Sequence, residues 1–347
     1  MISKKPIVDL APINTSMYVE GEPTEQNISF FRLRSGRGIT VCFVGNVGVI
    51  PELTLNDSTG IINDTKPWHK LCEEIRSNGS VAGIQLSCTP PKYRPRKQFE
   101  PNLLQEIELD RYRELLRAVS DKMWLRIETE FLRGIECALK VGFEHIQIHA
   151  AHGYLFSLVL DPTINCKLRG LDILRNLIQA VAHASKVQGS LRVSWGIGLT
   201  DDTLRTKAII DLWHSFRKEI RLDISRGYYN IDKSLIYPSP EAGEAPLLAD
   251  AVTLAEKYRT SQISVAGNVW NPFTMSQLPD NLSFSIARPL IADPDHLIRM
   301  SDGSAMVCDH CGKCHYFSRG LPSLICPKWG GYANDSSVQH FLASRRN

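Results

Sequence analysis

The feature that most constrains the fold is a regular alternation of short apolar runs with longer amphipathic stretches along the 347 residues. The runs are dense in Val and Ile, which is typical of strands buried on both faces. Eight runs are present: Ile7–Ile13, Ile39–Gly45, Val81–Leu86, His145–His149, Leu191–Trp195, Leu222–Ser225, Gln262–Ala266 and Leu282–Ala287. Alternating strands and helices predict a parallel α/β sheet. Eight repeats fit a closed (β/α)₈ TIM barrel better than an open, doubly wound sheet of two smaller domains.

The segments between the runs place apolar residues at three- and four-residue spacing, which predicts helices. The predicted helices are Leu109–Val141, Leu171–Ser185, Thr203–Glu219 and Pro246–Tyr258. Gly142 follows the longest of them, where a C-terminal cap is expected. Asp201 and Asp202 are interpreted as a helix N-cap rather than a metal-binding pair. Because no Pro/Ser-rich linker divides the chain, we expect a barrel over residues 1–300 and a cysteine-rich C-terminal extension over residues 301–347.

Composition and charge limit the binding partners and the cellular location that can be expected. With Lys+Arg 40 against Asp+Glu 37, the formal net charge is +3, which is too small to indicate a nucleic-acid or anionic-membrane partner. The longest apolar-rich stretch, Ile39–Ile50, is too short to span a bilayer, and no signal peptide is recognised at Met1–Leu10. We expect a cytoplasmic protein that acts on a small molecule, with no nucleic-acid or membrane partner. Its oligomeric state, a homo-oligomer included, stays open.

The chain has nine cysteines, an odd count that cannot all pair as disulfides within the chain. Four of them lie close together near the C-terminus: Cys308, Cys311, Cys314 and Cys326. The remaining five are scattered, so the pattern indicates a metal or cluster site in a reducing compartment. The C-x₂-C-x₂-C run, with a proline after the fourth cysteine, favours a 4Fe-4S cluster. The alternative is a structural zinc site that includes His310 or His315.

A second constellation follows the fourth predicted strand and consists of His149, His152 and Tyr154. The C-terminal ends of barrel strands form the active-site face. Two histidines three residues apart on a turn can point their ring nitrogens at one oxygen atom, and a nearby phenol can supply a proton. The three residues are therefore predicted to be catalytic. The alternative is a pair of capping or metal-binding histidines.

The residues around this constellation resemble a known family. The stretch Ile146–Leu160, continued by Asp161-Pro162 and Asn165, resembles the fourth-strand signature of the old yellow enzyme (NADH:flavin oxidoreductase) family. Similar strand ends follow in the family's order over about residues 7–326: Ala11-Pro12-Ile13-Asn14-Thr15, Gly45-Asn46-Val47, Gln85-Leu86, Arg192-Val193-Ser194, Ala266-Gly267-Asn268 and Arg288-Pro289-Leu290-Ile291-Ala292-Asp293-Pro294. Each motif is weak alone, and their common order makes the combination strong.

The resemblance implies a barrel that binds FMN. It assigns flavin contacts to Pro12, Ile13, Asn14, Gly45, Gln85 and Arg192, and phosphate contacts to Gly267, Asn268, Ala287 and Arg288. Gln85 would hydrogen-bond the flavin pyrimidine, and Arg192 would lie near flavin N1, where a cation stabilises the reduced ring. Backbone N–H groups and an arginine suit a dianionic phosphate at this end of a barrel. Ala287 replaces the family's usual glycine, which is tolerated because only its N–H is needed.

The cysteine-rich tail is similar to the cluster loop of one branch of this family, which includes trimethylamine dehydrogenase and 2,4-dienoyl-CoA reductase. In that branch the cluster relays single electrons between FMN and a second redox partner. The large members carry further FAD- and nucleotide-binding domains after the loop, and this chain has no Gly-x-Gly-x-x-Gly to supply them. We therefore expect electrons to arrive from a separate protein or from NAD(P)H that reaches the FMN.

The resemblance implies an oxidoreductase that moves a hydride between FMN and a small organic substrate. Reduction of an activated C=C bond is expected first, and oxidation or demethylation of an amine second. Rival interpretations are a non-redox barrel with zinc at the cysteines, and an inactive family member that serves in electron transfer or assembly. The family's Asp-x-Tyr-Gly-Gly loop is missing or rebuilt over Asn165–Leu171, where substrate analogy is weakest. Tyr228 and Tyr229 are both expected at the pocket wall or barrel rim, with proton donation as a minor alternative, and Trp270 is expected in the packing of the barrel.

Overall fold

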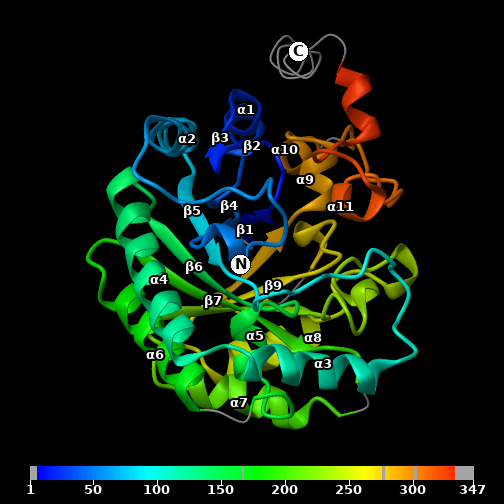
Figure 1. Cartoon of the computed structure of the whole chain (residues 1–347). Helices are drawn as coiled ribbons and strands as arrows, with labels where there is room; N and C mark the ends of the chain where they lie inside the picture. Colours follow the sequence, from blue (N-terminus) through cyan, green and yellow to red (C-terminus); the bar gives the residue numbers. More distant parts are fainter. Residues whose placement is uncertain (1–5, 166–167, 200, 276–277, 301–302, 333–347) are drawn as a thin grey trace.

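The computed structural model describes residues 6–165, 168–199, 201–275, 278–300 and 303–332. All eight predicted runs form strands, and these strands close into one parallel barrel in the order β1-β10-β9-β8-β7-β6-β5-β4 (Figure 1). The strands are β1 (Ile7–Ile13), β4 (Val41–Gly48), β5 (Val81–Ser87), β6 (His145–Ala150), β7 (Gln188–Gly196), β8 (Ile220–Arg226), β9 (Ile263–Ala266) and β10 (Leu282–Ile286). The prediction of a TIM barrel is confirmed.

Helices surround the barrel (Figure 1). In chain order they are α1 (Glu25–Arg34), α2 (Lys66–Ser77), α3 (Gln105–Arg117), α4 (Asp121–Val141), α5 (Leu155–Leu160), α6 (Leu168–His183), α7 (Thr203–His214) and α8 (Leu248–Lys257). A small antiparallel pair, β2 (Tyr18–Val19) with β3 (Glu22–Pro23), lies outside the barrel. Short 3₁₀ turns occupy Pro51–Leu53, Lys233–Leu235, Pro240–Ala242 and Pro272–Thr274. Within the described ranges, no helix is both long enough and apolar enough to cross a membrane.

The prediction of one continuous helix over Leu109–Val141 is wrong. The chain forms two helices there, α3 and α4, and the break falls between Arg117 and Asp121. Ser120 begins the second helix, because its side chain accepts a hydrogen bond from the backbone N–H of Met123 at 3.2 Å. Such a cap satisfies one of the free N–H groups of a helix start. The apolar spacing runs across the break, which is why periodicity alone did not reveal it.

The ends of the other predicted helices lie close to their expected places. Gly142 caps α4 with a left-handed backbone (φ 102°), and its N–H donates to Ala138 and Leu139 carbonyls. Asp202 stands at the N-cap of α7, but its carboxylate pairs with Arg205 instead of capping the helix. The neighbouring Asp201 accepts from the Thr203 N–H at 2.8 Å. Of the segment expected to be rebuilt, residues 166 and 167 lie outside the described residues, and α6 begins directly after them.

The interior of the barrel contains buried, paired charges. Asp9 and Asp223 are fully buried, and each pairs with an arginine of the interior, Asp9 with Arg221 at 2.6 Å and Asp223 with Arg192 at 3.1 Å. Gln147 extends this network, because its Nε2 donates to Asp223 at 2.9 Å. TIM-barrel interiors are more often filled with branched aliphatic residues. Here, hydrogen-bonded polar groups lead up to the C-terminal ends of the strands.

The chain beyond β10 lies against one side of the barrel mouth, in orange and red in Figure 1. It contains α9 (Arg288–Ala292), α10 (His296–Arg299), α11 (Tyr316–Arg319) and a 3₁₀ turn at Pro327–Tyr332. The Leu324 N–H donates to the Thr15 carbonyl at 2.9 Å, and the Trp329 indole donates to the Ile291 carbonyl at 2.7 Å. These bonds hold the cysteine-bearing segment beside the end of β1 and beside α9.

Candidate active site

A large cavity opens at the C-terminal ends of the strands, and it holds about 1400 Å³ of space with its open mouth included. The structure brings most of the sequence-predicted site residues together around it. Those that line it are Pro12, Ile13, Asn14, Gln85, His149, His152, Tyr154, Arg192, Gly267, Asn268, Ala287, Arg288 and Cys314. The residues come from six barrel strands or the turns that follow them, and from the C-terminal extension. Such a convergence is typical of ligand sites in this architecture.

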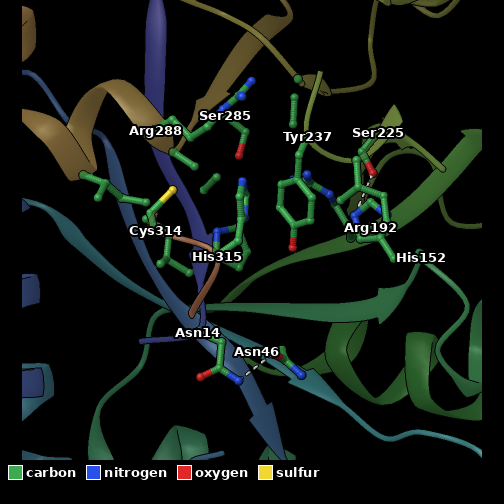
Figure 2. A pocket seen from close by; sticks show the side chains of 18 of the residues that line it. Asn14, Asn46, His152, Arg192, Ser225, Tyr237, Ser285, Arg288, Cys314 and His315 are labelled. Carbon is green, nitrogen blue, oxygen red and sulfur yellow. Dashed lines mark hydrogen bonds between the residues drawn. The ribbon is translucent and has the colours of Figure 1, made fainter. Parts of the chain in front are cut away.

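Gly45 lies just outside the lining, and its neighbour Asn46 faces the cavity instead. A Cβ atom at Gly45 would stand 2.9 Å from the Gln85 Cβ, so glycine permits the close approach of β4 and β5 at this point. Asn46 accepts from the Asn14 side chain at 3.2 Å (Figure 2) and donates to the Tyr154 hydroxyl oxygen at 3.0 Å. Asn46 therefore joins the end of β1 to the predicted proton donor.

His152 has both ring nitrogens engaged by the protein. Nδ1 lies 3.2 Å from the Gly227 carbonyl, and Nε2 lies 3.2 Å from the Ser225 hydroxyl (Figure 2). Burial and then Arg192 lower the pKa of His152 to about 3, so the ring is neutral. Since a carbonyl only accepts, Nδ1 carries the hydrogen and Nε2 accepts from Ser225. His152 thus presents no free nitrogen donor to the cavity.

His149 differs from its neighbour, although the two rings are only 5.5 Å apart. Its Nδ1 is buried and has no hydrogen-bond partner among the described residues. Burial, followed by His152 and Arg192, lowers the pKa of His149 well below its usual range, so this ring is neutral too. A neutral imidazole carries one N–H donor and one acceptor. Both remain available at His149 for a ligand in the cavity.

Tyr154 packs its ring against His149, with 4.3 Å between the ring centroids. Burial raises the pKa of the Tyr154 phenol well above 10, and the nearby Tyr229 adds to the effect. The phenol therefore keeps its proton at neutral pH. Because the Asn46 amide donates to the phenol oxygen, the O–H hydrogen is free to point elsewhere. A buried phenol with this arrangement can act as a hydrogen-bond or proton donor.

The lining includes buried polar atoms that the protein leaves without partners. They are Nε of Arg192, Oγ of Ser285 and Nδ1 of His149, and none has a hydrogen-bond partner in the described part of the chain. Buried polar groups are normally paired, so unpaired ones around a cavity indicate a polar ligand. Gln85, by contrast, donates to Gln147 at 2.7 Å, which leaves its own side-chain oxygen for a ligand. These residues fit the flat, polar edge of a flavin.

The two predicted phosphate turns lie side by side. Gly267 and Asn268 both have left-handed backbones (φ 114° and 54°), and a Cβ at Gly267 would point into open space. Asn268 accepts from Arg288 Nη2 at 2.7 Å, while its own amide donates to the carbonyls of Ser239 and Gly243 at 3.0 and 2.7 Å. The guanidinium and the open turn together fit an anionic phosphate.

Several lining residues were not assigned to this cavity from the sequence. They are Ser225, Lys233, Tyr237, Ser285, His315 and Tyr316. Trp270, expected in the packing of the barrel, also lines the cavity and packs its ring against His310, with ring centroids 3.9 Å apart. Tyr229 lies at the wall as expected, whereas Tyr228 donates to the Ser157 carbonyl at 2.8 Å in the interior.

All four clustered cysteines line a second, smaller cavity beside the first. Burial raises the pKa of the Cys314 thiol to about 12, and the neighbouring cysteines contribute to this rise. Within the described ranges, no three His, Cys, Asp or Glu side chains are placed to hold a single metal ion. The four thiols enclose a space, and that arrangement fits a cluster of several atoms. Arg288, Ile291 and Cys314 line both cavities and form the wall between them.

The histidines near the cysteines have other contacts. His315 lines the first cavity, beside Cys314 in Figure 2, and packs against Tyr237 with 3.9 Å between ring centroids. His310 accepts a hydrogen bond from Arg288 through Nδ1 at 3.2 Å. Among the described residues, neither histidine is grouped with the cysteines as ligands of one metal ion.

Comparison with known proteins finds relatives by sequence. Residues 8–168 match the sequence model of the NADH:flavin oxidoreductase / NADH oxidase family. A probable NADPH dehydrogenase of Candida albicans is 27% identical over 121 residues, which cover 30% of this chain and 30% of that protein. The NADH:fumarate oxidoreductase of Klebsiella pneumoniae is 27% identical over 172 residues, or 45% of this chain and 18% of that protein. The chain thus matches less than a third of either relative's length.

Solved structures share the fold. A complex of 2-naphthoyl-CoA reductase superposes with a TM-score of 0.75 at 12% identity, covering 97% of this chain and 56% of that one. The 6-hydroxypseudooxynicotine amine oxidase of Pseudomonas geniculata N1 superposes with a TM-score of 0.71 at 16% identity, covering 98% of this chain and 53% of that one. At such identities the likeness concerns the fold alone. Over residues 8–168 the chain is thus similar to the NADH:flavin oxidoreductase / NADH oxidase family, and its barrel has the fold of these solved structures.

Proposed function

We propose that the chain is an FMN-dependent oxidoreductase that reduces an activated C=C bond of a small organic substrate. One observation carries the proposal: groups suited to a flavin and to a substrate line the same cavity. His149 has a ring nitrogen without a partner among the described residues, and Tyr154 keeps its proton. Arg192 and the two turns that contain Gly267 and Arg288 line the cavity as well. The similarity of residues 8–168 to the NADH:flavin oxidoreductase / NADH oxidase family supports it. When bound there and reduced, FMN would supply the hydride, and the residues of the chain would bind and orient the substrate and provide the one proton that the reaction needs.

His149 holds the substrate in this proposal. Its neutral ring donates an N–H to the carbonyl oxygen or other acceptor that activates the C=C bond, and this polarises the bond. Tyr154 lies against the same ring and delivers a proton to the carbon that does not receive the hydride. His152 takes a narrower role than the sequence suggested. With both nitrogens bound to Ser225 and Gly227, it fixes the turn that presents Tyr154.

The charge of the cavity favours this reaction over the oxidation of an amine. Four lining residues are cationic, namely Arg192, Arg226, Lys233 and Arg288, and none of the described lining residues is Asp or Glu. A protonated amine would find no counter-charge in such a cavity, whereas a neutral or anionic enone or enoate would be accommodated. The amine reaction remains the second candidate, because a solved amine oxidase shares the fold.

The cysteine cavity is proposed to hold a 4Fe-4S cluster bound by Cys308, Cys311, Cys314 and Cys326. Thiolates at these spacings suit a four-iron cube, and all four line one cavity. A cluster there would relay single electrons between the flavin and an electron-transfer protein. The direct hydride donor is proposed to be NADPH or NADH, which the names of curated relatives support. Zinc is the weaker alternative, because His310 and His315 are engaged elsewhere.

One experiment tests both cofactors. The full chain is produced with iron supplied, purified anaerobically, and its absorption spectrum, released flavin and iron content are measured. We expect flavin bands with a broad iron–sulfur shoulder, about one FMN and four irons per chain. Addition of NADPH or NADH should bleach the flavin, and a substrate with an activated C=C bond should restore it. Protein that binds no flavin would overturn the proposal.

The cluster has a separate control. Cys311→Ser removes one thiol of the cavity and is expected to lower the iron content well below that of the unsubstituted chain. Cys137→Ser changes a partly buried cysteine of α4, away from the cavity, and should leave iron unchanged. Zinc in place of iron, or equal iron in both variants, would exclude the cluster while leaving the flavin proposal standing.

A further inference from the structure

Arg288 occupies the wall between the two cavities and is oriented from both sides. Its Nη2 donates to the Asn268 side chain at 2.7 Å, and Asn268 belongs to the open turn after β9. Its Nη1 lies 3.2 Å from Nδ1 of His310, a residue of the cysteine loop between Cys308 and Cys311. Because a guanidinium only donates, His310 is the acceptor in this bond. One arginine is thus held by the phosphate turn and by the cysteine loop together.

His310 is itself held firmly for a residue on a loop. Its ring packs at a tilt against the Trp270 indole, with centroids 3.9 Å apart, and the Arg288 guanidinium lies over the same indole at 5.9 Å. The Trp270 backbone is fixed in turn, because its N–H donates to Glu244 at 3.0 Å.

We propose that His310 is a positioning residue that couples the cysteine loop to the phosphate end of the flavin site. It would do so by fixing the Arg288 guanidinium toward the open turn at Gly267 and Asn268. The inference rests on the proposed function, since it takes the FMN phosphate as the ligand of Arg288. Coupling of this kind is reciprocal. An ordered cysteine loop strengthens FMN binding, and bound FMN steadies the loop.

The backbone of His310 offers a clean pair of substitutions. Its φ of 52° is left-handed, a region that glycine and asparagine adopt readily. His310→Gly removes the ring without straining the loop. His310→Asn also avoids strain and keeps a side-chain oxygen that can accept from Arg288. The comparison therefore isolates the hydrogen bond from the backbone conformation.

The test measures the Kd of the full chain for FMN and for riboflavin, which lacks the phosphate, by quenching of flavin fluorescence. Loss of a hydrogen bond to a charged group predicts about tenfold weaker FMN binding in His310→Gly. Riboflavin binding should change less than about twofold, and His310→Asn should recover most of the FMN affinity. As a second arm, FMN should slow the loss of iron to a chelator in the unsubstituted chain and not in His310→Gly.

The outcomes separate the two proposals. If the unsubstituted chain binds FMN but His310→Gly binds FMN equally well, or weakens both flavins alike, the coupling is wrong and the proposed function stands. If the unsubstituted chain binds no flavin, both fail. If His310→Gly does not fold, as judged by circular dichroism, Trp270→Leu is used instead. It removes the indole that packs against the His310 ring. It should then show the same selective loss of FMN, and unchanged selectivity would overturn the inference.

Discussion

The two histidines of the site are equivalent in the sequence and different in the structure. They stand three residues apart, yet His152 gives both nitrogens to the protein while His149 keeps a buried nitrogen without a partner among the described residues. The difference arises from β8, which supplies Ser225 and the Gly227 carbonyl on one side only. A motif can place two imidazoles near a ligand, and only their neighbours decide which of them binds it.

At this scale the sharpest prediction concerns Tyr154. Replacing it by phenylalanine removes the hydroxyl that accepts from Asn46 and with it the proposed proton donor. Reoxidation of the reduced flavin by the C=C substrate should slow by about a hundredfold or more, as measured by stopped-flow absorbance. Flavin reduction by NADPH should be nearly unchanged, because no proton from the phenol is needed there.

Tyr228→Phe is the matched control for that experiment. This tyrosine is the sequence neighbour of a lining residue, but its hydroxyl donates to the Ser157 carbonyl outside the cavity. It should cost some stability and leave the rate of flavin reoxidation close to that of the unsubstituted chain. If Tyr154→Phe turned over as fast as this control, the phenol would have no part in the proton transfer.

Sequence located the site residues by different signals. His149 stands at the end of a Val- and Ile-rich run, so the barrel rule places it at the mouth, whereas Gln85 and Arg192 were assigned from the family resemblance. Tyr237, Lys233 and His315 reach the same cavity from loops. Lys233 is held by the carbonyls of Arg96 and Lys97 at 3.1 and 3.4 Å. No local pattern predicts such contacts, because their partners are more than 130 residues away.

Among the elements, the strands were more predictable than the helices, and the reasons differ from case to case. Barrel strands are buried on both faces and read as apolar runs. Helix α1 was not predicted because its buried side includes Asn27 and Arg34, which interrupt the apolar period. Arg34 donates to the Leu290 and Ile291 carbonyls at 2.7 and 3.0 Å. Helix α2 was not predicted either, although its apolar residues do follow a helical period, at Trp68, Leu71, Cys72 and Ile75.

The cap of α4 gives a prediction at the scale of the element. Gly142 has a φ of 102°, and a Cβ there would stand 3.3 Å from Arg76 Nη1 and 3.4 Å from Cys72 Sγ. Gly142→Ala should lower the free energy of unfolding by about 1–2 kcal/mol, because the left-handed region disfavours a side chain. Urea denaturation checks this value. Gly142→Asn should cost less, and an alanine variant as stable as the parent would contradict the strain.

Across the whole molecule, burial keeps several imidazoles neutral. Burial is the largest cause that lowers the pKa of His145, His149, His152 and His315. In the unfolded chain each would titrate near 6.5. Between that value and the folded pKa, the unfolded state binds more protons, so the free energy of unfolding falls as the pH falls.

His145 isolates this effect, because it lies in the barrel interior and does not line the site. Its Nε2 is 3.0 Å from the Ser190 hydroxyl, a contact that an amide can retain. Urea unfolding at pH 7.5, 6.5 and 5.5 should show a loss of stability toward low pH, with a slope of up to about 1.4 kcal/mol per pH unit from this one group. His145→Gln should flatten the curve. Burial raises the pKa of Asp9, so this carboxyl also contributes to the pH dependence of stability. Its contribution is the same in His145→Gln and in the unsubstituted chain, and it cancels when their slopes are compared. Identical slopes would contradict the assignment.

The shared wall of the two cavities has a consequence for how such a protein can change over time. Arg288, Ile291 and Cys314 line both the larger cavity, proposed to bind FMN, and the cysteine cavity. A substitution at any of these three residues alters the lining of both cavities at once. The sequence at this wall therefore cannot change for one cavity without changing the other. A protein that lost the cysteine loop would also lose the His310 contact of Arg288, and it would need another residue to orient that side chain. The two sites are inherited together because they are, in part, the same residues.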